Sequence, residues 1–311
     1  MGTRFGSERI RLSKKENDFV KNPSADLLNM IVTYAFWLKK KLDAELIQKA
    51  IIKKVAASST KISPQDLEKT ISETYGLDKT RAKAVLKDLV AQGELEYTYE
   101  FGNTYLVPSF NKPVRIAAHV VVKPPGHRYQ PAPDDVVIQI RSGAAFGGGR
   151  HPTTRLAVKA IEYVLKEVRP QWLNQDCCVL DIGTGSGILA IAAVCLGVKK
   201  GLGIDIDPCA ISEADQNRVL NHLEDRIVIS DRDIDFVDPA FSMVIANLRH
   251  PSLKSFYPQI TRLTAVNGWV VLSGFRSYEL DDLKDLYTAK HFECIWTAAE
   301  LDWSAAVLKK I

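Results

Sequence analysis

Residues 179–187 have the sequence Val-Leu-Asp-Ile-Gly-Thr-Gly-Ser-Gly, and an apolar segment, Ile188–Leu196, follows directly. The first four residues predict a short buried strand, and the apolar segment predicts a helix. Glycines allow the backbone to turn sharply and to approach a ligand, because they carry no Cβ. The first N–H groups of the helix are then free to bind polar groups. A strand, a glycine turn and a helix in this order indicate a nucleotide-binding site in a doubly wound α/β domain.

The spacing of the glycines narrows the choice of ligand. Gly183, Gly185 and Gly187 follow a GxGxG pattern, whereas the dinucleotide fingerprint GxGxxG has its third glycine one residue later. A turn that need not hold a pyrophosphate suits the methionine part of S-adenosyl-L-methionine, whose ammonium group can be held by Asp181 or through water. We therefore predict a methyltransferase with a Rossmann-like sheet, and a dinucleotide oxidoreductase is the main competing interpretation.

Acidic residues accompany the next two predicted strands. The second strand, Leu202–Ile206, contains Asp205 about 20 residues after the glycine turn, where an acid accepts hydrogen bonds from both ribose hydroxyls. The third strand, Ile227–Ile229, leads into Asp231, a position suited to the adenine amino group. An ordinary loop acid is the alternative for Asp231. Asp207 precedes a proline, which favours its interpretation as a helix cap.

A single asparagine is the candidate catalytic residue. The fourth predicted strand, Phe241–Ala246, delivers Asn247 to the carboxyl edge of the sheet, where open α/β folds bind ligands. Its carbonyl can accept a hydrogen bond from an amine and direct the nitrogen lone pair toward a methyl donor, although a structural asparagine is the alternative. His151 and His250 are candidates for proton transfer, and each also fits a structural role.

The composition predicts a folded protein with two domains, because 311 residues with 46% hydrophobic and 25% charged residues suffice for two cores. The apolar stretch Leu27–Leu38 is shorter than the about 20 residues of a membrane span, so we expect a buried helix and no membrane association. No secretory signal opens the chain, and we expect a cytoplasmic location. The five cysteines lack zinc-ligand spacing, so we expect buried structural thiols and no metal site.

Four segments can be distinguished along the chain. Residues 1–23 form a basic arm, and residues 24–107 are expected to form a recognition domain. Residues 108–150, rich in proline and glycine, predict a strand-containing connector, and residues 151–311 predict the methyltransferase domain. The first 61 residues carry 13 Lys or Arg against 6 Asp or Glu. Such charge can favour an anionic partner such as nucleic acid or a ribosome, although a solvated face is the commoner cause.

Residues 24–107 have the pattern of helices followed by a hairpin. Capping residues and apolar periodicity predict one helix between Ser63 and Gly76 and another between Asp78 and Gly93. An alternating stretch and the turn Gly102-Asn103 then predict the hairpin. This order resembles a winged-helix module, which serves nucleic-acid contacts in some proteins and protein contacts in others. A purely structural role is the third interpretation.

Several motifs together resemble one family. Residues 145–154 read Ala-Phe-Gly-Gly-Gly-Arg-His-Pro-Thr-Thr, and D-I-G-T-G-S-G, G-I-D-I-D-P and V-I-A-N-L follow. Over residues 112–311 the chain resembles the ribosomal protein L11 methyltransferases of bacteria. The resemblance implies methyl transfer from S-adenosylmethionine to lysine side-chain and N-terminal amines of a ribosomal protein. It also implies a flexible lid or wall over the cofactor, formed by Phe146 and residues 147–149. The cofactor contacts that it implies are Thr154, Gly183, Asp205 and Asn247.

The chain departs from the family pattern at three places. Gly148 and Arg150 replace two threonines, Leu248-Arg249-His250 replaces the usual Ile-Leu-Ala, and residues 24–107 look helical where the family has a small α/β module. Arg150 would repel a lysine ammonium if it faced the pocket. A protein amine, with a ribosomal protein as one candidate, is the leading acceptor. The alternatives are RNA or DNA methylation and a nucleic-acid-binding regulator that binds the cofactor without catalysis.

Overall fold

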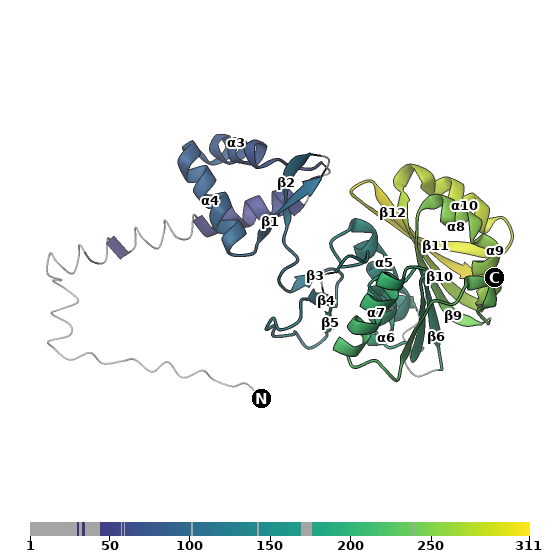
Figure 1. The fold of residues 1–311 in the computed structure, drawn as a ribbon. Coiled ribbons are helices and arrows are strands. Elements are labelled where there is room, and N and C mark those ends of the chain that lie inside the picture. Colours follow the sequence, from purple (N-terminus) through teal and green to yellow (C-terminus); the bar gives the residue numbers. More distant parts are fainter. Residues whose placement is uncertain are drawn as a thin grey trace, which may run out of the picture. The chain divides into compact units, whose positions relative to one another are not determined.

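The structure is a computed structural model that describes residues 30, 33–34, 44–56, 58, 60–100, 102–141, 143–168, 176–238 and 240–311. The predicted basic arm, residues 1–23, and most of the apolar stretch Leu27–Leu38 lie outside these residues. The chain separates into two units: the first ends at Val107, and the second comprises Pro108–Ile311 with Ser58–Lys61 (Figure 1). No helix in the described part is long and apolar enough to cross a membrane.

The first unit contains helices followed by a hairpin. Residues 44–56 are helical. The elements that follow are α3 (Pro64–Tyr75), α4 (Lys79–Ala91), β1 (Leu95–Glu100) and β2 (Asn103–Pro108). Ser63 caps α3 by accepting a hydrogen bond from the Asp66 N–H, and Gly76 ends it with a φ of 63°. Both helix boundaries confirm the predictions. The hairpin turn is shorter than predicted, because Asn103 already belongs to β2.

A separate hydrophobic core holds the first unit together. It combines side chains from residues 44–56, from α3 and α4 and from the hairpin. The largest of its buried side chains are Ile51, Leu67, Ile71, Leu86, Leu89, Leu95 and Leu106. Each is at most 2% exposed. Because these residues come from every element of the unit, the helices and the hairpin fold around one common core.

The second unit is built on a seven-stranded sheet with the order β11-β12-β10-β9-β6-β7-β8. The strands are β6 (Cys178–Ile182), β7 (Lys200–Ile204), β8 (Ile227–Ser230), β9 (Phe241–Asn247), β10 (Thr264–Arg276), β11 (Phe292–Glu300) and β12 (Trp303–Lys310). The first five are parallel, whereas β12 runs antiparallel to β10 and β11. The predicted α/β sheet is confirmed, and the inserted antiparallel strand distinguishes it from the usual dinucleotide-binding order.

Helices cover both faces of this sheet (Figure 1). One face carries α5 (Pro152–Glu162), α6 (Ile188–Cys195) and α7 (Pro208–Leu220), and the other carries α8 (His250–Ser255), α9 (Tyr257–Leu263) and α10 (Leu280–Thr288). Two hydrophobic clusters correspond to these faces: one includes α5 and α6, the other includes α8, α9 and α10. The apolar character of the central strands follows from this burial on both sides.

Three short strands form a second sheet in the region predicted as a connector. They are β3 (Val114–Arg115), β4 (Val120–Lys123) and β5 (Val136–Gln139). β4 pairs antiparallel with β3 and parallel with β5. Val120, Val122 and Ile138 belong to the same cluster as α5 and α6. The small sheet is therefore packed onto the helical layer of the second unit, and its last strand leads toward Phe146.

Three details differ from the expectations. β7 ends at Ile204 and not at Ile206, because Asp205 turns its carboxylate back to the glycine turn. The Ile206 side chain is 92% exposed. The pair Asn267-Gly268 predicts a turn before a strand Trp269–Ser273, whereas β10 begins at Thr264 and continues through Asn267, which has a φ of 60°. Cys209 is exposed at the start of α7, so it is not a buried thiol.

Candidate functional site

The glycine turn and Asn247 lie at the same edge of the large sheet. β6 and β9 are neighbours in the sheet, although β7 and β8 separate them along the chain. The chain therefore proceeds in opposite directions from this point, which makes it the topological switch point where doubly wound sheets bind ligands. Gly183 follows β6 directly, and Asn247 is the last residue of β9.

Alternation along the strands determines which side chains share a face. Val179 of β6 and Ile245 of β9 belong to the cluster on the α5–α6 face. Because side chains alternate along a strand, Asp181 and Asn247, two residues further on, point to the same face. Ser273 of β10 is in register with Asn247, and its hydroxyl donates a 3.0 Å hydrogen bond to the Thr153 carbonyl of α5. The start of α5 therefore lies beside the end of β9.

The turn after β6 has no room for side chains at two of its glycines. Gly183 has a φ of 69° and Gly185 a φ of 54°, in the left-handed region that favours glycine. A Cβ on Gly185 would lie 2.3 Å from the Phe146 carbonyl oxygen, and one on Gly183 would lie 2.6 Å from a methyl carbon of Leu248. The glycine turn is thus packed between the segment around Phe146 and the residue that follows β9.

Asp181 is fully buried beneath the turn. Its Oδ2 accepts hydrogen bonds from the Thr184 hydroxyl (2.7 Å) and from the Ala190 N–H (3.2 Å), whereas its Oδ1 has no partner. Burial raises the pKa of this carboxyl to about 6, and the two donors oppose the shift. Asp181 therefore has one oxygen occupied by the protein and one available to a donor.

Two further buried oxygens near this edge also lack partners. They are the Thr154 hydroxyl oxygen and the Asn247 side-chain carbonyl oxygen. Thr154 is fully buried in the first turn of α5, next to the residue whose carbonyl accepts from Ser273. Buried polar atoms are nearly always paired, so three such oxygens at one edge of a sheet need an explanation.

Asp205 is bonded to the glycine turn. Its Oδ2 accepts a hydrogen bond of 2.9 Å from the Gly185 N–H, and its Oδ1 accepts one of 3.1 Å from the Asp207 N–H. Asp207 caps α7 by accepting from the Cys209 N–H, as predicted. Asp231 is exposed directly after β8. Its neighbour Ser230 accepts a 3.2 Å hydrogen bond from the Asp205 N–H, and this backbone contact is what brings Asp231 near Asp205.

The segment 143–149 crosses the glycine turn and carries Phe146. The Ser186 N–H donates to the Phe146 carbonyl (2.8 Å), and the Ser186 hydroxyl donates to the Gly147 carbonyl (3.0 Å). The backbone at Gly147 and Gly149 is buried, whereas the Phe146 side chain is 53% exposed. The backbone of the segment is therefore tied to the turn while the aromatic ring projects outward.

Aromatic rings and a guanidinium group stack beside this segment. The His151 ring meets Phe146 edge-on at 5.2 Å and Trp303 at 4.8 Å, and the Arg276 guanidinium lies 3.9 Å above the Trp303 ring. Burial, together with Arg155 and Arg276, lowers the pKa of His151 to about 4. Its Nδ1 accepts the Thr153 N–H at 3.3 Å and so caps α5. A neutral, capping His151 favours the structural interpretation over proton transfer.

The other charged residues considered for this site are exposed or bonded to other groups. His250 is bonded through Nε2 to Asp282 Oδ2 at 2.6 Å, and Glu279 lies 4.0 Å from its Nδ1. The side chains of Arg150 and Arg249 are exposed. Asp282 has a lowered pKa because it accepts hydrogen bonds from Lys254 and His250. His250 therefore belongs to a polar contact between α8 and α10.

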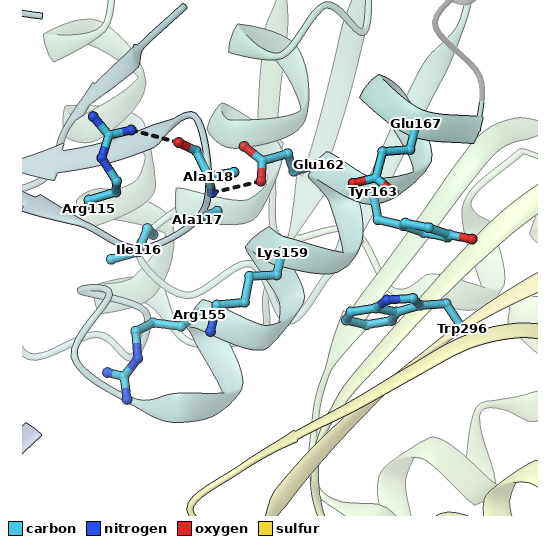
Figure 2. A pocket seen from close by; sticks show the side chains of 10 residues that line it. All are labelled: Arg115, Ile116, Ala117, Ala118, Arg155, Lys159, Glu162, Tyr163, Glu167 and Trp296. Atoms are coloured by element: carbon cyan, nitrogen blue, oxygen red, sulfur yellow. Dashed lines mark hydrogen bonds between the residues drawn. The ribbon is translucent and has the colours of Figure 1, made fainter. Parts of the chain in front are cut away.

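A groove of about 630 Å³ lies on the outer side of α5 (Figure 2). Arg155 and Lys159 project from α5 at one side, and Tyr163 stacks on Trp296 at the other, with ring centroids 5.7 Å apart. Glu300 forms ion pairs with both cations. The groove shares α5 with the candidate site, but its lining includes no residue of the glycine turn or of β9.

Sequence reasoning did not single out several residues that organise the site. Ser186 and Ser273 join its segments through the hydrogen bonds described above. Glu213 and Asn217 of α7 bond to the backbone before Phe146. The spacing of Glu213 and Asn217, four residues apart on the inner side of α7, was a signal that could have found them. Positions on the inner side of a helix are normally apolar, so polar residues there indicate specific hydrogen bonds.

The arrangement has the chemistry needed to hold a nucleoside with a cationic amine. Asp181 offers a carboxylate oxygen, Thr154 and Asn247 offer unpaired oxygens, and Asp205 is bonded to the glycine turn. The glycine turn excludes side chains from the same place. No group of three or more His, Cys, Asp or Glu that could hold a metal ion occurs among the described residues.

Comparison with known proteins identifies the family. A family profile described as ribosomal protein L11 methyltransferase (PrmA) matches residues 106–311, which is more than half of the chain. The chain belongs to the ribosomal protein L11 methyltransferase family. The match includes every predicted cofactor residue and begins within two residues of the boundary between the two units. The resemblance noted in the sequence is therefore confirmed.

Relatives named ribosomal protein L11 methyltransferase match about two thirds of this chain. The "ribosomal protein L11 methyltransferase" of Heliobacterium modesticaldum is 33% identical over 203 residues, 65% of this chain and 62% of the relative. That of Citrifermentans bemidjiense is 35% identical over 202 residues, 64% of each chain. The crystal structure of a ribosomal protein L11 methylase from Lactobacillus delbrueckii matches with a TM-score of 0.57 at 29% identity, over 64% of this chain and 98% of that one. The match thus spans less than two thirds of the length of the two curated relatives.

Proposed function

We propose that the protein transfers a methyl group from S-adenosyl-L-methionine to an amine nitrogen of a ribosomal protein. Membership of the L11 methyltransferase family supports the reaction class. The three unpaired buried oxygens of Thr154, Asp181 and Asn247 carry the proposal, because β6, β9 and the start of α5 bring them to the sheet edge at which the glycine turn lies. S-adenosylmethionine supplies a methyl group that its sulfonium has already activated for displacement.

Each part of the cofactor has a matching residue. The unpaired Asp181 oxygen would hold the ammonium of the methionine part, and the backbone of Gly183, Gly185 and Gly187 would form the turn beside it. Asp205 would accept from the ribose hydroxyls, and Asp231 would meet the adenine amino group. The unpaired Thr154 hydroxyl, in the first turn of α5, would form a hydrogen bond with the cofactor. The Phe146 ring would cover the cofactor at its exposed edge.

Asn247 is the proposed catalytic residue. Its unpaired carbonyl oxygen accepts a hydrogen bond from the acceptor amine and thereby directs the nitrogen lone pair. The bond from nitrogen to the methyl carbon forms as the bond from that carbon to sulfur breaks, and the nitrogen then loses a proton. A free lysine has a pKa of about 10.4, so burial at this edge must favour its neutral form. Since His151 and His250 are engaged, the proton passes to water.

The domain organisation remains part of the proposal. Residues 151–311 would form the methyltransferase domain and residues 108–150 its strand-containing connector. The helical region 24–107 would be a winged-helix-like recognition domain, supported by the order of α3, α4, β1 and β2. The bridge between Ile62 and Leu106 joins the segment before α3 to β2, which adds to the likeness. A cytoplasmic location and contact of the basic arm with nucleic acid are further predictions.

Two alternatives receive less support. RNA or DNA methylation would draw on the basic N-terminal residues, but the sequence Asn-Leu-Arg-His lacks the Asn-Pro-Pro-aromatic run of enzymes that methylate base amines. A regulator without catalysis would not need an unpaired oxygen at Asn247. The named relatives favour a protein acceptor over either alternative.

Radioactive labelling tests the proposal directly. The purified protein is incubated with methyl-labelled S-adenosylmethionine and either cell extract or recombinant ribosomal protein L11, and samples are then treated with protease or nuclease. We expect the label to be lost with protease and kept with nuclease. Label that survives protease but not nuclease would contradict a protein acceptor. Calorimetry that shows NAD binding but no binding of S-adenosylhomocysteine would contradict the cofactor.

A further inference from the structure

A row of polar side chains on α7 holds the segment that leads to Phe146. Glu213 and Asn217 are four residues apart on α7, and Asn221, the C-cap residue, continues the same spacing, so the three lie along one ridge. All three bond to backbone atoms of the neighbouring segment. We refer to these three residues as the α7 ridge.

Glu213 binds the segment immediately before Phe146. Its Oε1 accepts hydrogen bonds from the Ala144 N–H (2.7 Å) and the Ala145 N–H (3.1 Å), and its Oε2 also lies 3.1 Å from the Ala145 nitrogen. A Cβ on Gly143 would overlap the Glu213 carboxylate, at 2.2 Å. Backbone hydrogen bonds to a carboxylate are stronger than those between neutral groups. Glu213 therefore fixes the backbone at the start of segment 143–149.

Asn217 joins the segment before Phe146 to the glycine turn. Its Oδ1 accepts from the Arg141 N–H (2.9 Å), and its Nδ2 donates to the Ser186 carbonyl (2.9 Å). The side chain is 1% exposed, so both bonds are shielded from water. Asn221 continues the ridge by bonding both backbone groups of Gln139. The α7 ridge thus aligns the chain from β5 toward Phe146.

The same segment is also held at its middle and at its end. Ser186 donates to the carbonyls of Phe146 and Gly147, and Arg155 donates to the carbonyls of Gly149 and Arg150. Attachments from α7, from the glycine turn and from α5 are therefore present in the protein without ligand. A segment bonded in this way has little freedom to open and close.

These attachments place an aromatic ring next to the candidate site. The Phe146 carbonyl is bound to the glycine turn, and its ring meets His151, which begins the helix that carries Thr154. Phe146 therefore contacts the glycine turn through its backbone and the start of α5 through its ring. The start of α5 lies beside the end of β9, where Asn247 is, because Ser273 of β10 bonds Thr153 and is in register with Asn247.

We propose that Glu213 and Asn217 are positioning residues for methyl transfer: they set the Phe146 ring beside the acceptor path before any ligand binds. Segment 143–149 is then a fixed wall and not a lid. The inference rests on the proposed function. A wall that is ordered in advance saves the conformational entropy that a closing loop would lose on binding, and it keeps the reacting atoms aligned.

Amide hydrogen exchange tests whether the wall is set in advance. In the full-length protein without ligand, we expect slow exchange in peptides that cover residues 143–149. Replacing Glu213 by alanine (Glu213→Ala) should speed exchange at Ala144 and Ala145 about tenfold, as expected for the loss of roughly one net hydrogen bond. Glu213→Gln keeps one acceptor oxygen and should restore part of the protection. Rapid exchange in the wild type until S-adenosylhomocysteine is added would overturn the inference.

A double-mutant cycle tests whether Glu213 acts through Phe146. Glu213→Ala is expected to lower kcat for methylation of recombinant L11 by about tenfold, since small misplacement of reacting groups costs up to about a hundredfold. The same change in a Phe146→Ala background should have less than about a twofold effect, because the two residues act as one unit. If the two losses in kcat multiply, the positioning role is contradicted, because multiplying losses are expected of a residue that only stabilises the fold.

The controls separate this inference from the proposed function. Asp215→Asn removes a half-exposed acid of the same helix that forms an ion pair with Arg218, and it should leave both exchange and kcat unchanged. Asn217→Asp keeps the acceptor for Arg141 and loses the donor to Ser186, so it should affect kcat more than the affinity for S-adenosylhomocysteine. If the wild type methylates nothing, the proposed function fails, and hydrogen exchange still decides whether the wall is fixed.

Discussion

At the scale of single residues, Asp181 shows how burial prepares a group for a ligand. The protein satisfies one of its oxygens with Thr184 and Ala190 and leaves the other without a donor. Burial raises the pKa of the carboxyl from an ordinary value of 3.8 to about 6. The folded protein therefore keeps a proton between these pH values that the unfolded chain releases, and this contribution to stability is lost as the pH rises through about 6.

The affinity for S-adenosylhomocysteine should depend on the protonation of Asp181. In the proposed binding mode the ligand's ammonium pairs with the carboxylate, so binding should weaken as the pH falls below about 6 and level off above about 7. Calorimetric titrations at steps of about one pH unit, from about pH 5 to about pH 8, would measure this dependence. Asp181→Asn is expected to bind more weakly and without this pH dependence. An unchanged slope in the variant would assign the titration to another group.

Asn247 and His250 are expected to differ sharply in their effects on the reaction. Asn247→Ala should lower kcat about a hundredfold, the usual cost of losing one hydrogen-bonding group from a reacting centre, with a smaller effect on cofactor affinity. His250→Gln should change kcat less than about twofold, because His250 is bonded to Asp282. Methylation of recombinant L11 at saturating cofactor checks both. A large loss in His250→Gln would restore its candidacy for proton transfer.

At the scale of elements, the first turn of α5 depends on an uncharged histidine. His151 accepts the Thr153 N–H and has a pKa lowered from 6.5 to about 4. The unfolded chain takes up a proton in this range before the folded protein does, so stability falls as the pH drops from 6.5 to about 4. His151→Asn keeps a capping side chain without titration. Urea unfolding should show the wild type losing stability relative to the variant over this range, and a constant difference would contradict the assignment.

Local patterns predicted the elements better than their contacts. The glycine turn, the helix after it and the Asp207 cap followed from residue type and spacing, which act within a few residues. The end of β7 did not, because the bond between Asp205 and the Gly185 N–H joins residues 20 positions apart. The α7 ridge was overlooked for a similar reason. Apolar periodicity describes what a helix buries against a core, and Asn217 is buried against backbone.

The candidate site shows the same division. The sequence singled out Thr154, Asp181 and Asn247, and the structure leaves an oxygen of each unpaired at one edge of the sheet. It did not indicate that Asp181 would be fully buried or that the carbonyls of Phe146 and Gly147 would be bonded to Ser186. Such pairings depend on strand order and on the packing of segments far apart in the chain, which a local pattern does not contain.

At the scale of the whole molecule, the two units have separate hydrophobic cores. A fragment that begins at Pro108 should therefore fold alone and bind S-adenosylhomocysteine within about threefold of the full chain. Its kcat/KM for the protein acceptor should fall much more than its cofactor affinity, because the first unit is the proposed recognition domain. Calorimetry and labelling on the two proteins would check this. Equal acceptor kinetics would remove the first unit from substrate recognition.

The family match starts at residue 106, and the division between the units falls between Val107 and Pro108. Evolution can exchange what precedes such a seam by recombination, without disturbing the sheet, the glycine turn or the unpaired oxygens behind it. A new acceptor preference can then arise in one genetic event while the chemistry is inherited intact. On the proposed function, the second unit would carry methyl transfer unchanged, and the module fused in front of it would determine the target.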